Sequence, residues 1–124
     1  MYAPALETYR RQQVETASPM QLVRMLYDAM LQSTREAKVA LEAKDYATAN
    51  DRLQHAQRVV EELDHAVDEE KGGDIAHNLR RLYDFLVQRL IYVNITKSVN
   101  ALEDTEMVME EMHAMWSAVP GWEL

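Results

Sequence analysis

The sequence predicts an all-α protein, an up-down antiparallel four-helix bundle with a short N-terminal arm or helix packed on it. Glycine and proline occur only three times each in 124 residues, and they lie where helical stretches begin or end. Between them run four stretches of about 20 residues in which apolar side chains recur every three or four positions. No stretch keeps the alternating pattern of a strand, and short turns between long helices favour antiparallel neighbours.

The chain is expected to divide into an arm, a bundle and a tail. Residues 1–14 form the expected arm, with Leu6 and Tyr9 as apolar anchors, residues 15–120 form the bundle, and residues 121–124 form a short tail. The first helix should begin after Ser18, because Ser18 and Gln21 have the spacing of a capping box. Pro19 presets φ at the first helical position. This helix should end near residue 43.

The first helix carries more apolar side chains than one neighbouring helix can cover. A narrow seam, which we expect to face the bundle, consists of Leu22, Leu26, Ala29 and Ser33. The apolar surplus beyond that seam includes Met25, Tyr27 and Met30. We expect the surplus to need cover from another segment or from a partner.

Two further helices follow, each with a local start signal. Asp45 is placed to cap a helix whose apolar seam runs as far as Val67, and Gly72 with Gly73 should end that helix. Asp74 should then cap a third helix that reaches about residue 97. The apolar seam expected for the third helix consists of Leu79, Leu82, Leu86, Leu90 and Val93.

Polar side chains beside the apolar seam of the third helix leave two interpretations open. Asn78, Arg89 and Asn94 lie close to apolar positions, where an amide is costly unless it forms hydrogen bonds. They are either satisfied within the bundle, or they hold the backbone of a bound peptide.

The fourth helix is acidic and rich in methionine. Asn100 and Glu103 have the spacing of a capping box, and Pro120 should end the helix. The whole chain has a formal net charge of −8, which argues against binding to nucleic acid or to an anionic membrane surface. It has no cysteine, no signal-peptide pattern and no apolar stretch long enough to cross a membrane, so we expect a cytoplasmic protein.

Two Glu-x-x-His units raise the alternative of a metal-binding bundle enzyme of the di-iron type. Such enzymes place these units on two helices that face inward. At about 100° per residue, however, Glu62, His65 and Glu110 of the pairs Glu62–His65 and Glu110–His113 fall far from the apolar seams and should point to water. We therefore expect no catalytic residue, metal site or cofactor. A generic helical adaptor for another secreted protein is a further alternative.

Several segments together resemble the flagellar export chaperone FliS family. They are Tyr9 in the arm, ETASPMQLVRMLYDAM at 15–30, DYATAN at 45–50, EKGGDIAHNLRRLYDFLVQRLIYVN at 70–94, and Trp116. The resemblance spans nearly the whole chain. It implies a cytosolic four-helix bundle that binds the C-terminal segment of newly made flagellin, prevents its early polymerisation and escorts it to the flagellar type III export gate.

The surplus apolar surface predicts where such a client would lie. Helices with apolar residues beyond their seam offer a platform for the apolar face of an amphipathic client helix. We expect the arm to cover this platform until the client arrives, and a homodimer that buries it is an alternative. The expected partner-binding residues are Leu6, Tyr9, Gln13, Met25, Tyr27, Met30, Asn78, Leu82, Tyr83, Leu86, Arg89 and Asn94.

Overall fold

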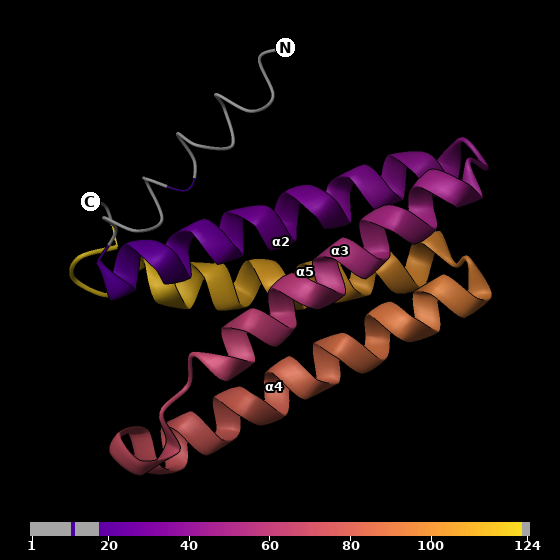
Figure 1. Ribbon diagram of the computed structural model, residues 1–124. Coiled ribbons are helices and arrows are strands. Elements are labelled where there is room, and N and C mark those ends of the chain that lie inside the picture. The colour runs from indigo at the N-terminus through magenta and orange to yellow at the C-terminus, as the bar shows by residue number, and fades with distance from the viewer. Residues whose placement is uncertain (1–10, 12–17, 123–124) are drawn as a thin grey trace.

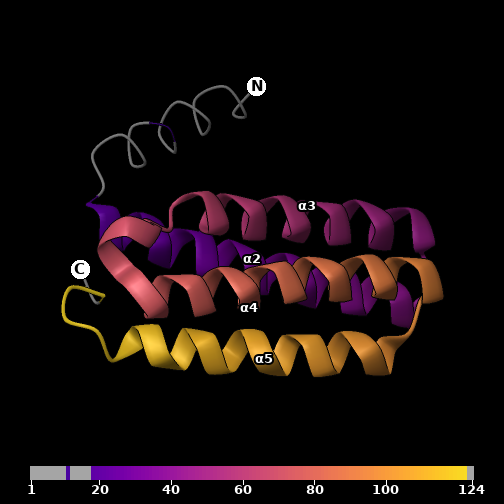
Figure 2. The ribbon, with the colours of Figure 1, turned by 90° about the horizontal axis from the view of Figure 1, so that it is seen from below.

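The computed structural model describes Arg11 and residues 18–122. In that part of the chain the helices are α2 (Pro19–Glu42), α3 (Tyr46–His65), α4 (Glu69–Thr96) and α5 (Val99–Ser117). Figures 1 and 2 show them side by side in one bundle, in which α2 and α4 each contact both α3 and α5. The predicted all-α four-helix bundle is confirmed.

The first two helix starts follow the local signals in the sequence. The Ser18 hydroxyl accepts from the Gln21 backbone N–H at 3.2 Å, and the Gln21 side chain accepts from the Ser18 N–H at 2.9 Å. Asp45 accepts from the Thr48 N–H at 3.2 Å at the start of α3. Each bond satisfies a donor that the first helical turn leaves free, so both predicted caps are present.

The start of α5 differs from the prediction. Ser98 is its cap, and the Ser98 hydroxyl accepts from the Ala101 N–H at 3.1 Å. Asn100 lies inside the first turn of the helix, so the predicted Asn100–Glu103 capping box is wrong. Serine and asparagine are equally good caps, and local preference therefore could not choose between them.

The connection between α3 and α4 is the largest departure from the predicted elements. Helix α3 ends at His65 with Ala66 as its C-cap, well before the two glycines. Asp68 then caps a first turn of α4, and Gly73 lies at a kink of that helix with φ 55° and ψ −131°. Figure 1 shows the bend near the beginning of α4. Only glycine adopts this conformation without strain, because it has no Cβ. The predicted end of the second helix at Gly72 and Gly73 is therefore wrong, and α4 begins earlier than predicted.

The core lies between all four helices. Close packing of α2 on α3 rests on small buried side chains, among them Ala37, Ala40 and Ala49. The largest fully buried side chains include Tyr27, Met30, Leu53, Leu63, Tyr83, Leu86, Leu90, Leu102 and Met109. Within residues 18–122, every buried side-chain nitrogen or oxygen has a hydrogen-bond partner. None of the described helices is both long and apolar enough to cross a membrane.

Trp122 is a core residue, although a tail was expected from residue 121. Gly121 turns the chain back with φ 94°, and only 5% of Trp122 is exposed. Arg24 Nη1 donates to the Trp122 carbonyl oxygen at 3.0 Å. The Trp122 ring lies edge-on to Tyr27 with centroids 6.0 Å apart and stacks on Trp116 at 6.3 Å. These contacts tie the end of α5 to the beginning of α2.

Candidate functional site

Four of the expected partner-binding residues are core residues: Tyr27, Met30, Tyr83 and Leu86, each 0 or 1% exposed. The hydroxyl groups of Tyr27 and Tyr83 form a hydrogen bond of 2.8 Å across the bundle. The expected division of the first helix is thus wrong for Tyr27 and Met30, which face the interior. Leu22 and Leu26 are partly exposed, although Leu26 also packs against the core. Tyr27 can face inward because its hydroxyl finds a buried partner and its ring packs against both tryptophans.

The buried tyrosine pair predicts a pH dependence of stability. Burial, with Tyr83 close by, raises the pKa of Tyr27, and burial also raises the pKa of Tyr83. A tyrosine whose folded-state pKa is raised stabilises the fold below its ordinary pKa near 10, and this contribution is lost as pH rises further. We expect the free energy of unfolding to fall above about pH 10, by up to about 1.4 kcal/mol per pH unit for each tyrosine.

Urea titrations at about pH 9 and 11 measure this fall. The double variant Tyr27→Phe, Tyr83→Phe should show a smaller fall than the wild type. Tyr92→Phe is the matched control: Tyr92 is 48% exposed, and this variant should keep the wild-type fall. Equal falls in the wild type and the double variant would contradict the role given to the buried pair.

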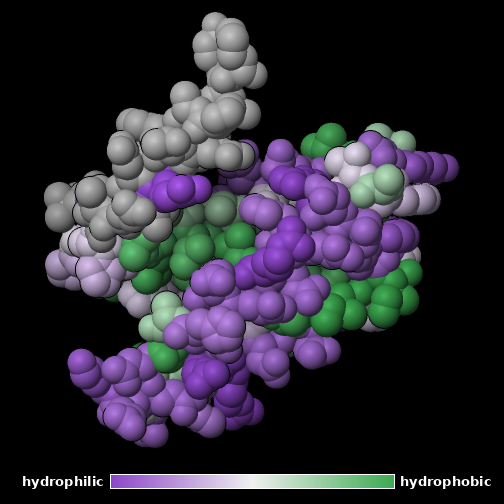
Figure 3. Space-filling model, viewed as in Figure 1, coloured by the Kyte–Doolittle hydropathy of each residue, from purple (hydrophilic) through white to green (hydrophobic). Residues whose placement is uncertain are grey.

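An apolar groove of about 670 Å³ lies between the N-terminal half of α2 and the C-terminal end of α3. Figure 1 shows the two helices diverging toward this end, and Figure 3 shows apolar surface exposed between them. The groove is lined by Pro19, Leu22, Val23, Met25, Leu26, Ala29, Glu62, His65 and Ala66. Its size is typical of a binding pocket, and its lining is almost entirely apolar. We call it the α2–α3 groove.

A smaller cavity of about 240 Å³ adjoins the groove beneath the α3–α4 connection. Val23 and Ala66 line both spaces, so the two form one apolar depression. Its other lining residues include Val67, Ala76, Leu79 and Trp116. Ile75 lies on the rim with 81% of its surface exposed.

Only one of the described residues expected to bind a partner lines the α2–α3 groove, namely Met25. Asn78 and Leu82 are exposed on α4, and the Arg89 guanidinium lies 4.8 Å from the Tyr92 ring centroid. Their binding role stays a prediction. Leu6, Tyr9 and Gln13 lie outside the described residues.

Of the two interpretations left open for Asn94, the structure supports an amide whose hydrogen bonds are satisfied within the bundle. Its Nδ2 donates to Asn50 Oδ1 of α3 at 2.7 Å, and its Oδ1 accepts from Lys97 Nζ at 2.8 Å. The amide therefore links α3 to the end of α4. Both of its polar atoms have partners, so they are not free for a peptide backbone unless these bonds break.

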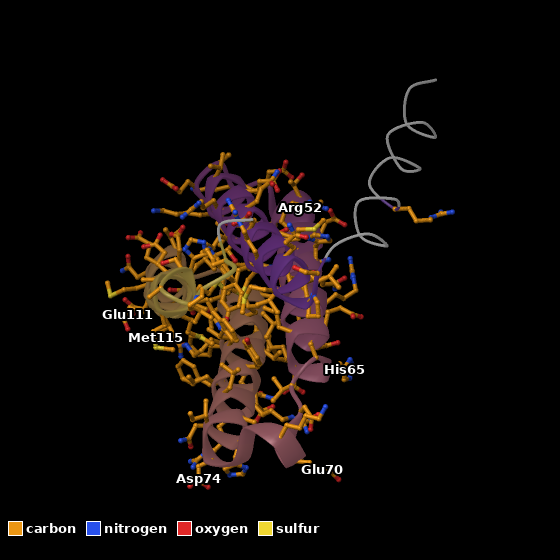
Figure 4. All side chains as sticks on the ribbon, turned by 90° about the vertical axis from the view of Figure 1, so that its left-hand side faces the viewer. Arg52, His65, Glu70, Asp74, Glu111 and Met115 are labelled. Atoms are coloured by element: carbon orange, nitrogen blue, oxygen red, sulfur yellow. The ribbon has the colours of Figure 1, made fainter. Side chains whose placement is uncertain are left out.

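The two Glu-x-x-His units do not converge. Glu62 and His65 are exposed on α3, and Figure 4 shows His65 pointing away from the bundle. Glu110 pairs with Arg35 of α2 at 3.3 Å. His113 is only partly exposed, because its ring packs at a steep angle against Trp122 with centroids 5.5 Å apart. Among the described residues no three metal-ligating side chains come together, so the geometry gives the di-iron alternative no support.

Sequence reasoning missed most of the groove. Leu22 and Leu26 were assigned to the interior, and the contributions of Glu62, His65 and Ala66 depend on where α3 ends. The seam Leu22, Leu26 and Ala29 was the signal that could have identified the groove. However, the spacing within one helix does not decide which of its two apolar stripes faces the core. The packing of the other helices decides it.

Comparison with known proteins places the chain in a family. Residues 1–121 match the sequence pattern of the family described as "Flagellar protein FliS". The chain is 31% identical to the flagellar secretion chaperone FliS of Salmonella typhimurium, over 94% of this chain and 90% of that protein. It is 28% identical to the protein of the same name from Vibrio cholerae, over 94% and 88%. It is 31% identical to that of Escherichia coli, over 83% and 76%. The chain belongs to the FliS family of flagellar secretion chaperones.

Proposed function

We propose that this protein is a cytoplasmic export chaperone for flagellin. It binds the C-terminal segment of flagellin, prevents premature polymerisation and, once loaded, delivers the client to the flagellar type III export gate. Family membership supports the class of function, and the α2–α3 groove is the single structural observation that carries the proposed mode of binding. The relatives are named as secretion chaperones, which supports a binding role without catalysis.

The α2–α3 groove has the chemistry to receive one face of an amphipathic helix. Leu22, Met25 and Leu26 lie on one side of the groove, spaced three and four residues apart, as the side chains of a docked client helix would also be. Methionine adapts its shape to different apolar partners, which suits a site that holds a client only until export. On the other side, Glu62 and His65 supply a polar rim.

The groove reaches the beginning of α2, which the N-terminal arm precedes in the sequence. Pro19, the first residue of α2, is one of the groove's lining residues. We propose that the arm covers the groove through Leu6, Tyr9 and Gln13 in the absence of client. Such a lid would lower the apparent affinity for the client by the fraction of molecules in which the groove is open.

Deletion of residues 1–13 tests the lid. The affinity for a C-terminal flagellin peptide is measured by calorimetry for the full chain and for the shortened chain. Tighter binding by the shortened chain is the expected result, because the competing segment is gone. Loss of binding would instead show that the arm contacts the client directly, and an unchanged affinity would contradict any role of the arm in binding.

Two observations distinguish the flagellin chaperone from an adaptor for other secreted proteins. Flagellin from the same organism should copurify with the chain, and its C-terminal peptide should compete with full-length flagellin. A flagellin that lacks its C-terminal segment should not copurify. Retention of the truncated flagellin would contradict the proposed client segment.

A further inference from the structure

The chain between α3 and the body of α4 is held by few contacts. Residues 68–73 form one short helical turn that ends at the kink at Gly73, and we call this turn the flap. Every residue from Asp68 to Ile75 is exposed, so no buried side chain anchors the flap. Figure 4 shows Glu70 and Asp74, on either side of the kink, at the tip of the bundle. A segment with so few buried contacts opens at a much smaller cost in free energy than the core does.

One side chain of α4 latches the flap to the bundle. Arg80 Nη1 donates to Glu69 Oε1 in the flap at 3.0 Å, and Arg80 Nε donates to Asp64 Oδ1 at the end of α3 at 3.1 Å. Within residues 18–122 the neighbouring Glu70 forms no ion pair. The side chains of Arg80 and Glu69 are 42% and 48% exposed, so their ion pair is a weak latch that can open.

Two glycines allow the flap to close on α4. A Cβ atom on Gly72 would lie only 2.5 Å from the Cβ of Ala76, so any larger residue at position 72 would push the flap away from α4. Gly73 has a φ of 55°, which other residues adopt only with strain, and it joins the flap to the body of α4. The closed position of the flap therefore depends on both glycines, and Gly73 is the joint at which the flap can turn.

The closed flap borders the smaller apolar cavity of about 240 Å³. Asp68 and Gly72 of the flap line this cavity together with Trp116 of α5. An apolar cavity of about 150 Å³ can hold a benzene ring, so this one has room for a large apolar side chain. The cavity is continuous with the α2–α3 groove at Val23 and Ala66. A client helix in the groove would therefore have the flap beside it.

We propose that the flap turns outward about Gly73, against the Arg80 latch, and admits one large apolar side chain of the client into the cavity. This inference rests on the proposed client site in the α2–α3 groove. The closed flap keeps the cavity covered in the free protein. Opening it breaks one partly exposed ion pair, whereas the four-helix core stays packed.

A single introduced thiol measures the opening of the flap, because the chain has no cysteine. Ala76 lines the cavity and is 5% exposed, so Ala76→Cys should react with a maleimide only when the flap opens. Ala101→Cys is the matched control: Ala101 is 7% exposed and lies at the start of α5, far along the chain from the flap. Without client, the thiol at position 76 should react at least tenfold faster than the thiol at position 101.

Two further substitutions in the Ala76→Cys chain test the latch and the glycine contact. Glu69→Gln should raise the labelling rate by about two- to fivefold, because the ion pair with Arg80 is lost. Glu70→Gln, in the same helical turn, should leave the rate unchanged. Gly72→Ala should raise the rate by at least tenfold, because its Cβ cannot fit against Ala76 in the closed position.

The client peptide tests what the cavity receives. Gly72→Ala in the otherwise unchanged chain should bind a C-terminal flagellin peptide at least threefold more tightly than the wild type, because a closed flap no longer lowers the apparent affinity. In the chain with both Gly72→Ala and Ala76→Cys, saturating peptide should slow labelling at least tenfold, because a client side chain then fills the cavity.

Three results would overturn the proposal. The first is a thiol at position 76 that reacts as slowly as the one at position 101. The second is an equal effect of Glu69→Gln and Glu70→Gln on the labelling rate. The third is a thiol that stays fully reactive when the peptide is bound. A chain that binds no peptide would refute the proposed function and the client's place in the cavity, while the rates without peptide would still decide whether the flap opens.

Discussion

The double substitution Leu22→Glu, Met25→Glu is expected to weaken binding of the flagellin C-terminal segment by about a hundredfold or more. Both side chains line the α2–α3 groove, and neither packs on the buried core cluster as Leu26 and Ala29 do. Two carboxylates in the groove would lose their water when an apolar client face docks, and no Lys or Arg is among the described residues that line it. Calorimetry with a C-terminal flagellin peptide measures the loss.

The same variant should fold normally, because glutamate is a good helix former and the replaced side chains lie outside the core cluster. Its free energy of unfolding in urea should stay within about 1 kcal/mol of the wild type. Val39→Glu carries a charge on the same helix but outside the groove, and it should bind the peptide as the wild type does. Wild-type affinity in the double variant would exclude the groove as the client site.

Replacing Trp122 by alanine is expected to lower the free energy of unfolding by about 3 to 5 kcal/mol. The substitution would leave a cavity beside Tyr27 and Trp116. It would also remove the ring against which the His113 ring packs. Urea unfolding followed by circular dichroism gives the value.

Val119→Ala, in the same C-terminal turn, is the control for Trp122→Ala. Val119 is 37% exposed, so its truncation should cost less than about 1 kcal/mol. A loss of similar size in both variants would mean that the turn as a whole, and not the burial of the Trp122 ring, stabilises the bundle.

The four helices could be predicted because their starts and periods are local properties. Ser18 and Asp45 cap the residues that the sequence assigns to them, since a cap bonds an N–H group only three positions away. The α3–α4 connection was predicted less well, because the glycine pair looks like a helix end. In the structure Gly73 lies at a kink inside α4, and α3 ends at His65 without a glycine.

The candidate site could be predicted only in part, because it depends on contacts between distant segments. The spacing of apolar residues gives α2 two overlapping apolar stripes. The stripe with Tyr27 faces inward because Tyr83 of α4 forms a hydrogen bond with Tyr27. Trp122, near the other end of the sequence, packs against the same tyrosine, and no local sequence pattern predicts that contact. Met25 was assigned correctly to the surplus, although its neighbours in the groove were not.

Photo-crosslinking from the rim of the groove tests the central claim most directly. A photoreactive amino acid is placed at His65, which is exposed on the rim of the α2–α3 groove, and in a separate chain at Val39, which is exposed outside it. With a C-terminal flagellin peptide added, the account predicts crosslinks from position 65 and none from position 39. Crosslinks from position 39 and none from position 65 would contradict it.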